Sequence, residues 1–334
     1  MDLRNRIRLG IVALAIALIA APSVASELRA NARPRGAGIL VHDAAETLRD
    51  YCVSENGTLY FQIPGGARWE LVTSASDPAI ANPGDGTFHP YERGEVTSAL
   101  AGVRFPLRGI SAEVFILPYP RRASLESAAG PGLILLSPGV RKLSREHQHS
   151  EFVHELGHVI QYEIMPDANA QAWASYMHLR GLDASRYQAN AVHALRPHEV
   201  WAEDFRALFG GAIATSNGTI ENDELAYPTQ VNGLEGFMQD VAADAEARVA
   251  ASLIAMPLGH GAVTFSRIGH FTAALDVFDA QGRVLATVEP TSGETGTEWN
   301  WDGRSRDGGV LGSQIVFARV RAAEAGAVRV VVLR

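Results

Sequence analysis

Cysteine is nearly absent from this chain of 334 residues, in which Cys52 is the only one. One thiol cannot close an intramolecular disulfide, so a hydrophobic core has to hold the fold together. Hydrophobic residues make up 47% of the chain, which is enough for such a core. We expect Cys52 to be a small buried hydrophobe, because its neighbours Tyr51 and Val53 offer no charge that stabilises a thiolate.

Positive charge is also scarce. The formal net charge is -8, and the chain has no basic run and no basic stripe with interleaved aromatic residues. Phosphate backbones are bound by clustered Lys and Arg side chains, so this charge balance argues against nucleic acid as a partner.

A hydrophobic run long enough to cross a membrane is missing as well. The apolar segment Ile11–Ala21 is shorter than the ~20 residues that a span requires. Three arginines precede it and small residues follow it up to Ala25, an arrangement typical of a signal peptide. We therefore expect residues 1–25 to be removed by cleavage after Ala25, leaving a secreted or periplasmic protein without a stable membrane span. An uncleaved membrane anchor is the alternative.

The middle of the chain shows strands followed by helices. Val114–Leu117 and Leu133–Leu136 are compact apolar runs bounded by Pro and Gly, which indicates buried strands. Capping residues, prolines and glycines then delimit periodic apolar segments. The expected helices run from Ser144 to Pro166, from Asn169 to Leu182, from Pro197 to Gly210 and from Gly233 to Ser252. This order predicts an α+β fold.

Past Leu258 the sequence changes to short segments typical of strands, separated by turn residues such as Gln281-Gly282 and Asp307-Gly308. Several strands at this spacing indicate a small β-sandwich. We place a domain boundary between residues 255 and 260.

The helix expected after Ser144 carries His154-Glu155-Leu156-Gly157-His158, an HExxH sequence. Residues four apart lie on the same face of a helix, so both imidazoles can bind one metal ion with the carboxylate of Glu155 beside them. Two imidazoles, a base and an open coordination position are what zinc-assisted hydrolysis requires. A solvated polar helix face is the alternative interpretation.

A catalytic zinc site needs a third protein ligand. Glu199 and Glu203 lie four apart on the helix expected from Pro197, so they share a face, and one can complete the site while the other accepts the outer N–H of a ligating histidine. A three-histidine site is disfavoured, because the sixth residue after His158 is Ile164 and the glycine of such a turn is replaced by Gln161.

Here the chain resembles the gluzincin zinc metallopeptidases, and in particular the catalytic domain of anthrax lethal factor-type peptidases, over His154–His158 and Glu199–Arg206. The resemblance implies a zincin-like domain at residues 106–257 that binds one Zn²⁺ per chain and acts on a peptide or protein substrate. It implies His154, His158 and Glu199 as ligands, Glu155 as general base, and Glu203 as a residue that supports a ligand.

The sequence departs from that family at the residue that stabilises the oxyanion. The family has a tyrosine seven residues before the ligand glutamate, and this chain has Val192 there. His193 and Tyr187 are the candidates for the missing group. Trp201 and Phe205 are expected in the core. The other histidines near the motif and its partner helix are expected at the surface, namely His147, His149, His178 and His198.

The C-terminal segment Trp299-Asn300-Trp301-Asp302-Gly303-Arg304 resembles part of the Ig-like domain of flagellar hook-capping proteins, which is appended to many secreted bacterial enzymes. The resemblance covers residues 262–334 and implies a β-sandwich with no chemistry of its own, able to bind a cell-surface or extracellular target. Gln314 and Val316 replace the usual glycine and tyrosine, so the packing there must differ.

These features favour a secreted zinc metallopeptidase that uses a zinc-activated water with Glu155 as general base. The alternatives are a catalytically inactive exported zincin-like protein that binds through its Ig-like module, and a hydrolase of small amides. Residues 26–105 remain open between a propeptide, an inhibitory segment and a part of the catalytic lobe.

Overall fold

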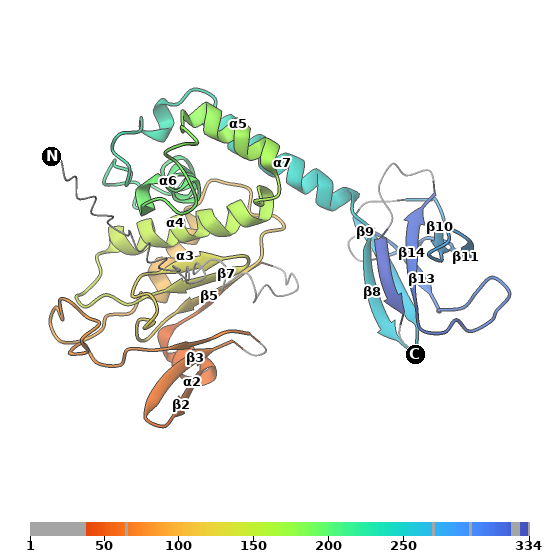
Figure 1. The fold of residues 1–334 in the computed structure, drawn as a ribbon, viewed down its shortest axis with the longest axis horizontal. Helices are drawn as coiled ribbons and strands as arrows, with labels where there is room; N and C mark the ends of the chain where they lie inside the picture. Colours follow the sequence, from red (N-terminus) through yellow and green to blue (C-terminus); the bar gives the residue numbers. More distant parts are fainter. Residues whose placement is uncertain (1–37, 64–65, 269–270, 294–295, 322–327, 333–334) are drawn as a thin grey trace, which may run out of the picture. The chain divides into compact units, whose positions relative to one another are not determined.

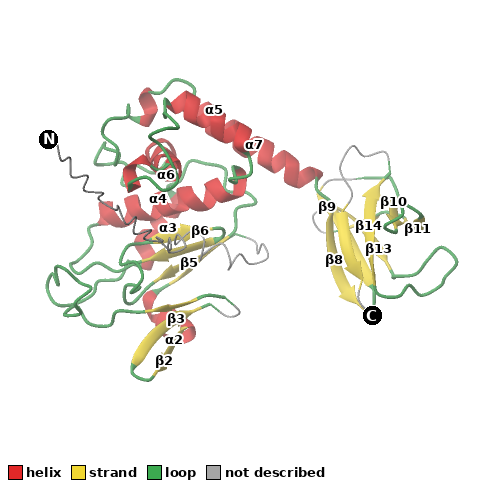
Figure 2. Ribbon diagram, viewed as in Figure 1, coloured by secondary structure: helices red, strands yellow, loops and turns green. Residues whose placement is uncertain are grey.

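The computed structural model describes residues 38–63, 66–268, 271–293, 296–321 and 328–332. The expected signal peptide and its cleavage site after Ala25 lie outside the described residues. Within the described part, no helix is both long and apolar enough to span a membrane. Helices and four sheets occur in this part of the chain, which confirms the α+β class at the level of secondary structure (Figure 2).

The chain divides into two compact units, which we describe separately. The first contains residues 38–102, 111–159 and 212–216, and the second contains residues 103–110, 160–211 and 217–332. Helix α4 (Arg145–Ile164) is continuous across the division.

The main sheet of the first unit has the order β1-β5-β7-β6. Strands β1 (Ile39–His42), β5 (Ala112–Ile116) and β7 (Leu133–Leu136) are parallel, and β6 (Ala128–Gly130) is an antiparallel edge strand. All four residues of β7 are buried, as expected for a parallel strand covered on both faces. Because β1 pairs with β5, part of the N-terminal region at 26–105 is built into this sheet.

A smaller sheet, β2 (Cys52–Glu55), β3 (Thr58–Gln62) and β4 (Arg68–Glu70), shares a core with one face of the main sheet. Phe61 and Trp69 from the small sheet and Phe115 and Leu135 from the main sheet belong to this core. Figure 1 shows α3 (Arg93–Ala101) and α4 on one side of the main sheet and α2 (Ala44–Tyr51) with β2 and β3 on the other. Cys52 is half-buried at this core, and burial raises the pKa of its thiol to about 11.

The expected helix boundaries agree with the structure to within a few residues. The hydroxyl of Ser144 accepts a hydrogen bond from the backbone N–H of His147, so Ser144 caps α4 as expected. Helix α5 (Ala170–Arg180) begins after the capping Asn169, α6 (Pro197–Phe209) begins at Pro197 and ends before Gly210, and α7 spans Leu234–Ala251. Two short 3-10 helices, η1 (His193–Leu195) and η2 (Pro228–Gln230), lie between α5 and α7 along the chain.

Helices α5 and α6 of the second unit are joined by a buried ionic network. The guanidinium Nε of Arg180 donates to both carboxylate oxygens of Asp204 at 3.0 Å, and the hydroxyl of Tyr176 donates to the same carboxylate at 2.7 Å. The side chains of Arg180 and Asp204 are 1% and 0% exposed. Since α6 carries Glu199, this network fixes a helix on which the candidate metal centre depends.

We expect Arg180→Met to lower the free energy of unfolding by about 3–5 kcal/mol, because it leaves the carboxylate of Asp204 buried without its cation. Burial raises the pKa of the Asp204 carboxyl from 3.8 to about 6, against the opposing effects of Arg180 and Tyr176. The Asp204 carboxyl thus holds its proton more readily in the folded state than in the unfolded chain. The stability that it contributes falls as the pH rises from 3.8 to about 6. At pH 4 the Asp204 carboxyl is mostly protonated and needs no cation, whereas at pH 7 it is mostly ionised. Arg180→Met should therefore lower the free energy of unfolding more at pH 7 than at pH 4.

Urea unfolding at both pH values measures this effect. Arg186→Met is the matched control, because Arg186 forms a solvent-exposed pair with Glu224, and its loss is expected to cost less than about 1 kcal/mol. A similarly small loss for Arg180→Met at pH 7 contradicts the structural role of the network.

The C-terminal strands form two four-stranded sheets around one core. Their orders are β12-β13-β9-β8 and β11-β10-β14-β15. The strands are β8 (Ile254–Gly259), β9 (Ala262–Ile268), β10 (Leu275–Phe278), β11 (Val284–Val288), β12 (Thr291–Ser292), β13 (Gly296–Trp301), β14 (Gln314–Val320) and β15 (Val328–Val332). The core takes Phe265 and Trp299 from the first sheet and Val277 and Val316 from the second. Strand β8 pairs with β9, so the first sheet begins before the predicted domain start at residue 262.

Candidate metal centre

The two histidines of the HExxH sequence lie one turn apart on α4. The ring centroids of His154 and His158 are 4.9 Å apart and their planes meet at 80°, so the rings approach edge to face. Glu155 and His158 are buried at 6% and 8% exposure, although both are polar. Burial of polar side chains on a helix face is costly unless partners are present, so a solvated polar face does not describe this part of α4.

Glu199 lies in the first turn of α6, two residues after Pro197. Proline is favoured at the first helical position, because a backbone N–H there has no partner within the helix and its absence costs nothing. A carboxylate in the first turn is stabilised by the helix dipole. The side chain of Glu199 is 14% exposed. The sequence thus builds a helix start that presents a largely buried carboxylate.

The structure brings His154, His158 and Glu199 together. Each offers one ligand atom, and these atoms all lie within 4.8 Å of one another. In a tetrahedral zinc site, ligand atoms stand about 2 Å from the metal and hence about 3–4 Å from one another. The bound of 4.8 Å is close to that spacing, and imidazole nitrogen and carboxylate oxygen are both zinc donors, so the residues present could hold a metal ion in a three-ligand site.

Glu203, expected to support a ligand, is held by a buried arginine. Its carboxylate accepts hydrogen bonds from Nε and Nη2 of Arg206 at 3.1 and 2.8 Å, and from the backbone N–H of Glu221 at 3.0 Å. Arg206 is 2% exposed and also donates to the carbonyl of Thr219 at 2.6 Å. Glu203 therefore ties α6 to the loop that follows it.

The structure separates the two candidates for the oxyanion-stabilising group. His193 lies beside the site, with its Nε2 3.3 Å from Oε2 of Glu199 and its Nδ1 2.8 Å from Oε2 of Glu221. Tyr187 is 5% exposed, and its hydroxyl accepts a hydrogen bond from the amide of Asn222 at 3.1 Å. Tyr187 is thus a packed side chain with an amide partner, whereas His193 contacts the carboxylate of Glu199.

One of the histidines expected at the surface is buried. His149 is 3% exposed and its Nε2 lies 2.8 Å from Oε2 of Glu95 on α3, so the surface prediction was wrong for this residue. His147 and His178 are exposed as expected. His198 is 25% exposed, because its ring stacks on Trp173 at 4.7 Å. Trp201 and Phe205 are fully buried, which confirms the core prediction.

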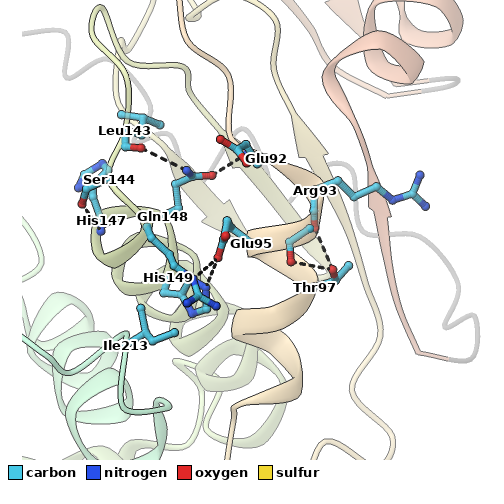
Figure 3. Close-up of polar contacts among 12 residues, drawn as sticks. Glu92, Arg93, Glu95, Thr97, Leu143, Ser144, His147, Gln148, His149 and Ile213 are labelled. Carbon is cyan, nitrogen blue, oxygen red and sulfur yellow. Dashed lines mark hydrogen bonds and ion pairs between the residues drawn. The ribbon is translucent and has the colours of Figure 1, made fainter.

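The buried His149 belongs to a set of polar contacts that attach α4 to α3 (Figure 3). Oε2 of Glu95 also accepts a hydrogen bond from Nε of Arg145 at 2.8 Å. One residue before His149, Gln148 accepts a hydrogen bond from the backbone N–H of Glu92 at 2.7 Å. These contacts fix the N-terminal half of the motif helix and hence the direction of the face that carries His154 and His158.

Two further residues in this region could not be predicted from the sequence. Tyr91 is 4% exposed, and its hydroxyl oxygen lies 3.4 Å from Nε2 of His147. Burial and then the negative charge of Glu151 raise the pKa of its phenol, with a smaller contribution from Glu155. Glu221, the partner of His193, is the other. Neither belongs to a motif, and both lie in loops, where the sequence gives no periodic signal.

Comparisons with known proteins do not identify a family for this chain. No protein-family model matches the chain, and no curated protein matches it. A solved structure of PorZ, described as an essential bacterial surface component of the type-IX secretion system of Porphyromonas gingivalis, is similar over 26% of this chain and 12% of its own length. The sequence identity is 22% and the TM-score is 0.21, a likeness that supports no conclusion about fold or function.

Proposed function

We propose that this protein is a secreted zinc-dependent metallopeptidase, with His154, His158 and Glu199 as zinc ligands and Glu155 as general base. The observation that carries the proposal is the convergence of these three ligand side chains beside a buried carboxylate. Two imidazoles and one carboxylate are the donor set of many catalytic zinc sites, in which a fourth position stays open for water or substrate. Bound zinc would supply Lewis acidity, which polarises the scissile carbonyl and lowers the pKa of water.

The role of Glu155 follows from its place on α4. It follows His154 directly in the chain, and with 6% exposure its carboxylate is shielded from bulk solvent. A carboxylate in such a position can accept a proton from the attacking water and deliver it to the leaving amine. The chain itself thus supplies both proton transfers of peptide hydrolysis.

Export is the part of the proposal that rests on sequence alone. The arginines before the apolar segment Ile11–Ala21 and the small residues up to Ala25 support a cleaved signal peptide. The C-terminal sandwich then fits an accessory module, and a cell-surface or extracellular target is what it would bind.

Cleavage of casein or a peptide library by the purified mature chain tests this function. We expect hydrolysis that a zinc chelator such as 1,10-phenanthroline abolishes and that added Zn²⁺ restores, while the non-chelating 1,7-isomer has no effect. A metal-loaded protein that binds peptides but cleaves none supports the inactive exported binding protein instead. Cleavage that survives complete removal of the metal contradicts the proposal.

A further inference from the structure

A histidine connects the metal-ligand carboxylate to a second carboxylate outside the ligand set. The imidazole of His193 lies between Glu199, 3.3 Å from its Nε2, and Glu221, 2.8 Å from its Nδ1. The contact with Glu221 has the length of a charge-assisted hydrogen bond, whereas the contact with Glu199 is slightly longer than an ordinary one. His193 and Glu221 are 47% and 41% exposed in their side chains, so neither is needed to fill the core.

The backbone around Glu221 is fixed to the same helix that carries Glu199. The N–H of Glu221 donates to Glu203 on α6, and Thr219 accepts a hydrogen bond from Arg206, also on α6. The amide of Asn222 donates to the carbonyl of Ala194 in η1 at 2.9 Å. The loop at 219–222 is therefore bonded both to η1, which contains His193, and to α6 at Glu203 and Arg206.

A ligand carboxylate gives one oxygen to a metal in a three-ligand site, and its remaining oxygen needs a partner that keeps the group from rotating. In known metal sites such partners orient the ligand and raise metal affinity. A ring held by Glu221 at one nitrogen presents its other nitrogen in a fixed direction, here toward Glu199. The arrangement has the order carboxylate, imidazole, carboxylate, and it ends on the metal ligand.

We propose that Glu221 and His193 form a positioning pair, which orients the carboxylate of Glu199 for metal binding. This inference rests on the proposed function, because it requires Glu199 to be a ligand. It differs from the sequence-based hypothesis that His193 stabilises the oxyanion, since a positioning residue affects metal affinity in the absence of substrate.

Zinc dissociation constants of the full mature chain, measured by competition with a chelator of known affinity and without substrate, test the pair. We expect His193→Ala and Glu221→Ala each to weaken zinc binding about 10–100-fold. The double variant should lose little more than either single variant, because the two residues act in series. His193→Gln keeps an N–H donor and should regain part of the affinity. Glu224→Ala, on the same loop but paired with the exposed Arg186, is the control and should bind zinc like the wild type.

The outcomes separate this inference from the proposed function. Wild-type zinc affinity in the His193→Ala and Glu221→Ala variants, with a loss confined to kcat, overturns the positioning role and leaves the peptidase proposal intact. A wild-type protein that binds no zinc removes the basis of both. Unfolding temperatures of the metal-free variants should equal that of the metal-free wild type, and a large drop together with no rescue by His193→Gln also contradicts the positioning role.

Discussion

Glu155→Gln is expected to abolish peptide hydrolysis while leaving zinc bound. The amide has the size of the carboxylate but cannot accept a proton from water, so the general-base step is lost without a change in packing. General acid–base catalysis contributes about 10²–10⁴-fold, and a loss of kcat/KM of at least this order is expected. The metal should stay in place, because the three ligand side chains are unchanged.

Steady-state kinetics on a fluorogenic peptide, combined with metal analysis of the same preparation, measure both halves of this prediction. Glu163→Gln is the matched control on the same helix, since Glu163 is five residues beyond His158 and so points about 140° away from it. Turnover near the wild-type rate in Glu155→Gln contradicts the assigned role. Loss of the metal in that variant shows instead that the carboxylate is needed to build the site.

Glu199→Ala is expected to remove both the metal and the activity. Two imidazoles remain after this change, which is one ligand short of the three that catalytic zinc sites have. The zinc affinity should therefore fall by more than the roughly 100-fold that loss of an outer partner costs. Hydrolysis at submicromolar zinc should disappear.

The control for this variant is Glu235→Ala. Glu235 is an exposed carboxylate in the first turn of α7, as Glu199 is in the first turn of α6, so its removal tests for a general effect of a helix N-terminal charge. Zinc binding and turnover should stay at wild-type values in the control. Equal losses in both variants, or wild-type affinity in Glu199→Ala, contradict the ligand assignment.

Helices and strands whose ends are set by neighbouring residues could be predicted from the sequence. Ser144 caps α4, and Pro197 and Gly210 delimit α6, because caps, prolines and glycines act within a few residues of their own position. Strand β7 was predicted at Leu133–Leu136 because a compact apolar run bounded by Pro and Gly is typical of a buried strand. For the site, helix periodicity sufficed to place His154 and His158 on one face.

Features that depend on distant partners could not be read in this way. His149 looks like a surface residue in the sequence, because nothing local shows that Glu95, 54 positions earlier, lies 2.8 Å from its ring. The pairing of β1 with β5 joins residues 73 positions apart, such as Ile39 and Ala112, and parallel pairing leaves no turn signal between them. Glu221 lies in a loop, and no sequence pattern predicts its contact with His193.

Elemental analysis of the purified mature protein, after dialysis against buffer free of metal and chelator, tests the proposed zinc centre most directly. We expect about one zinc per wild-type chain and almost none in Glu199→Ala, in which one of the three proposed ligands is lost. Wild-type protein that contains no divalent transition metal and takes up none on addition of Zn²⁺ contradicts the metal centre and the peptidase function built on it.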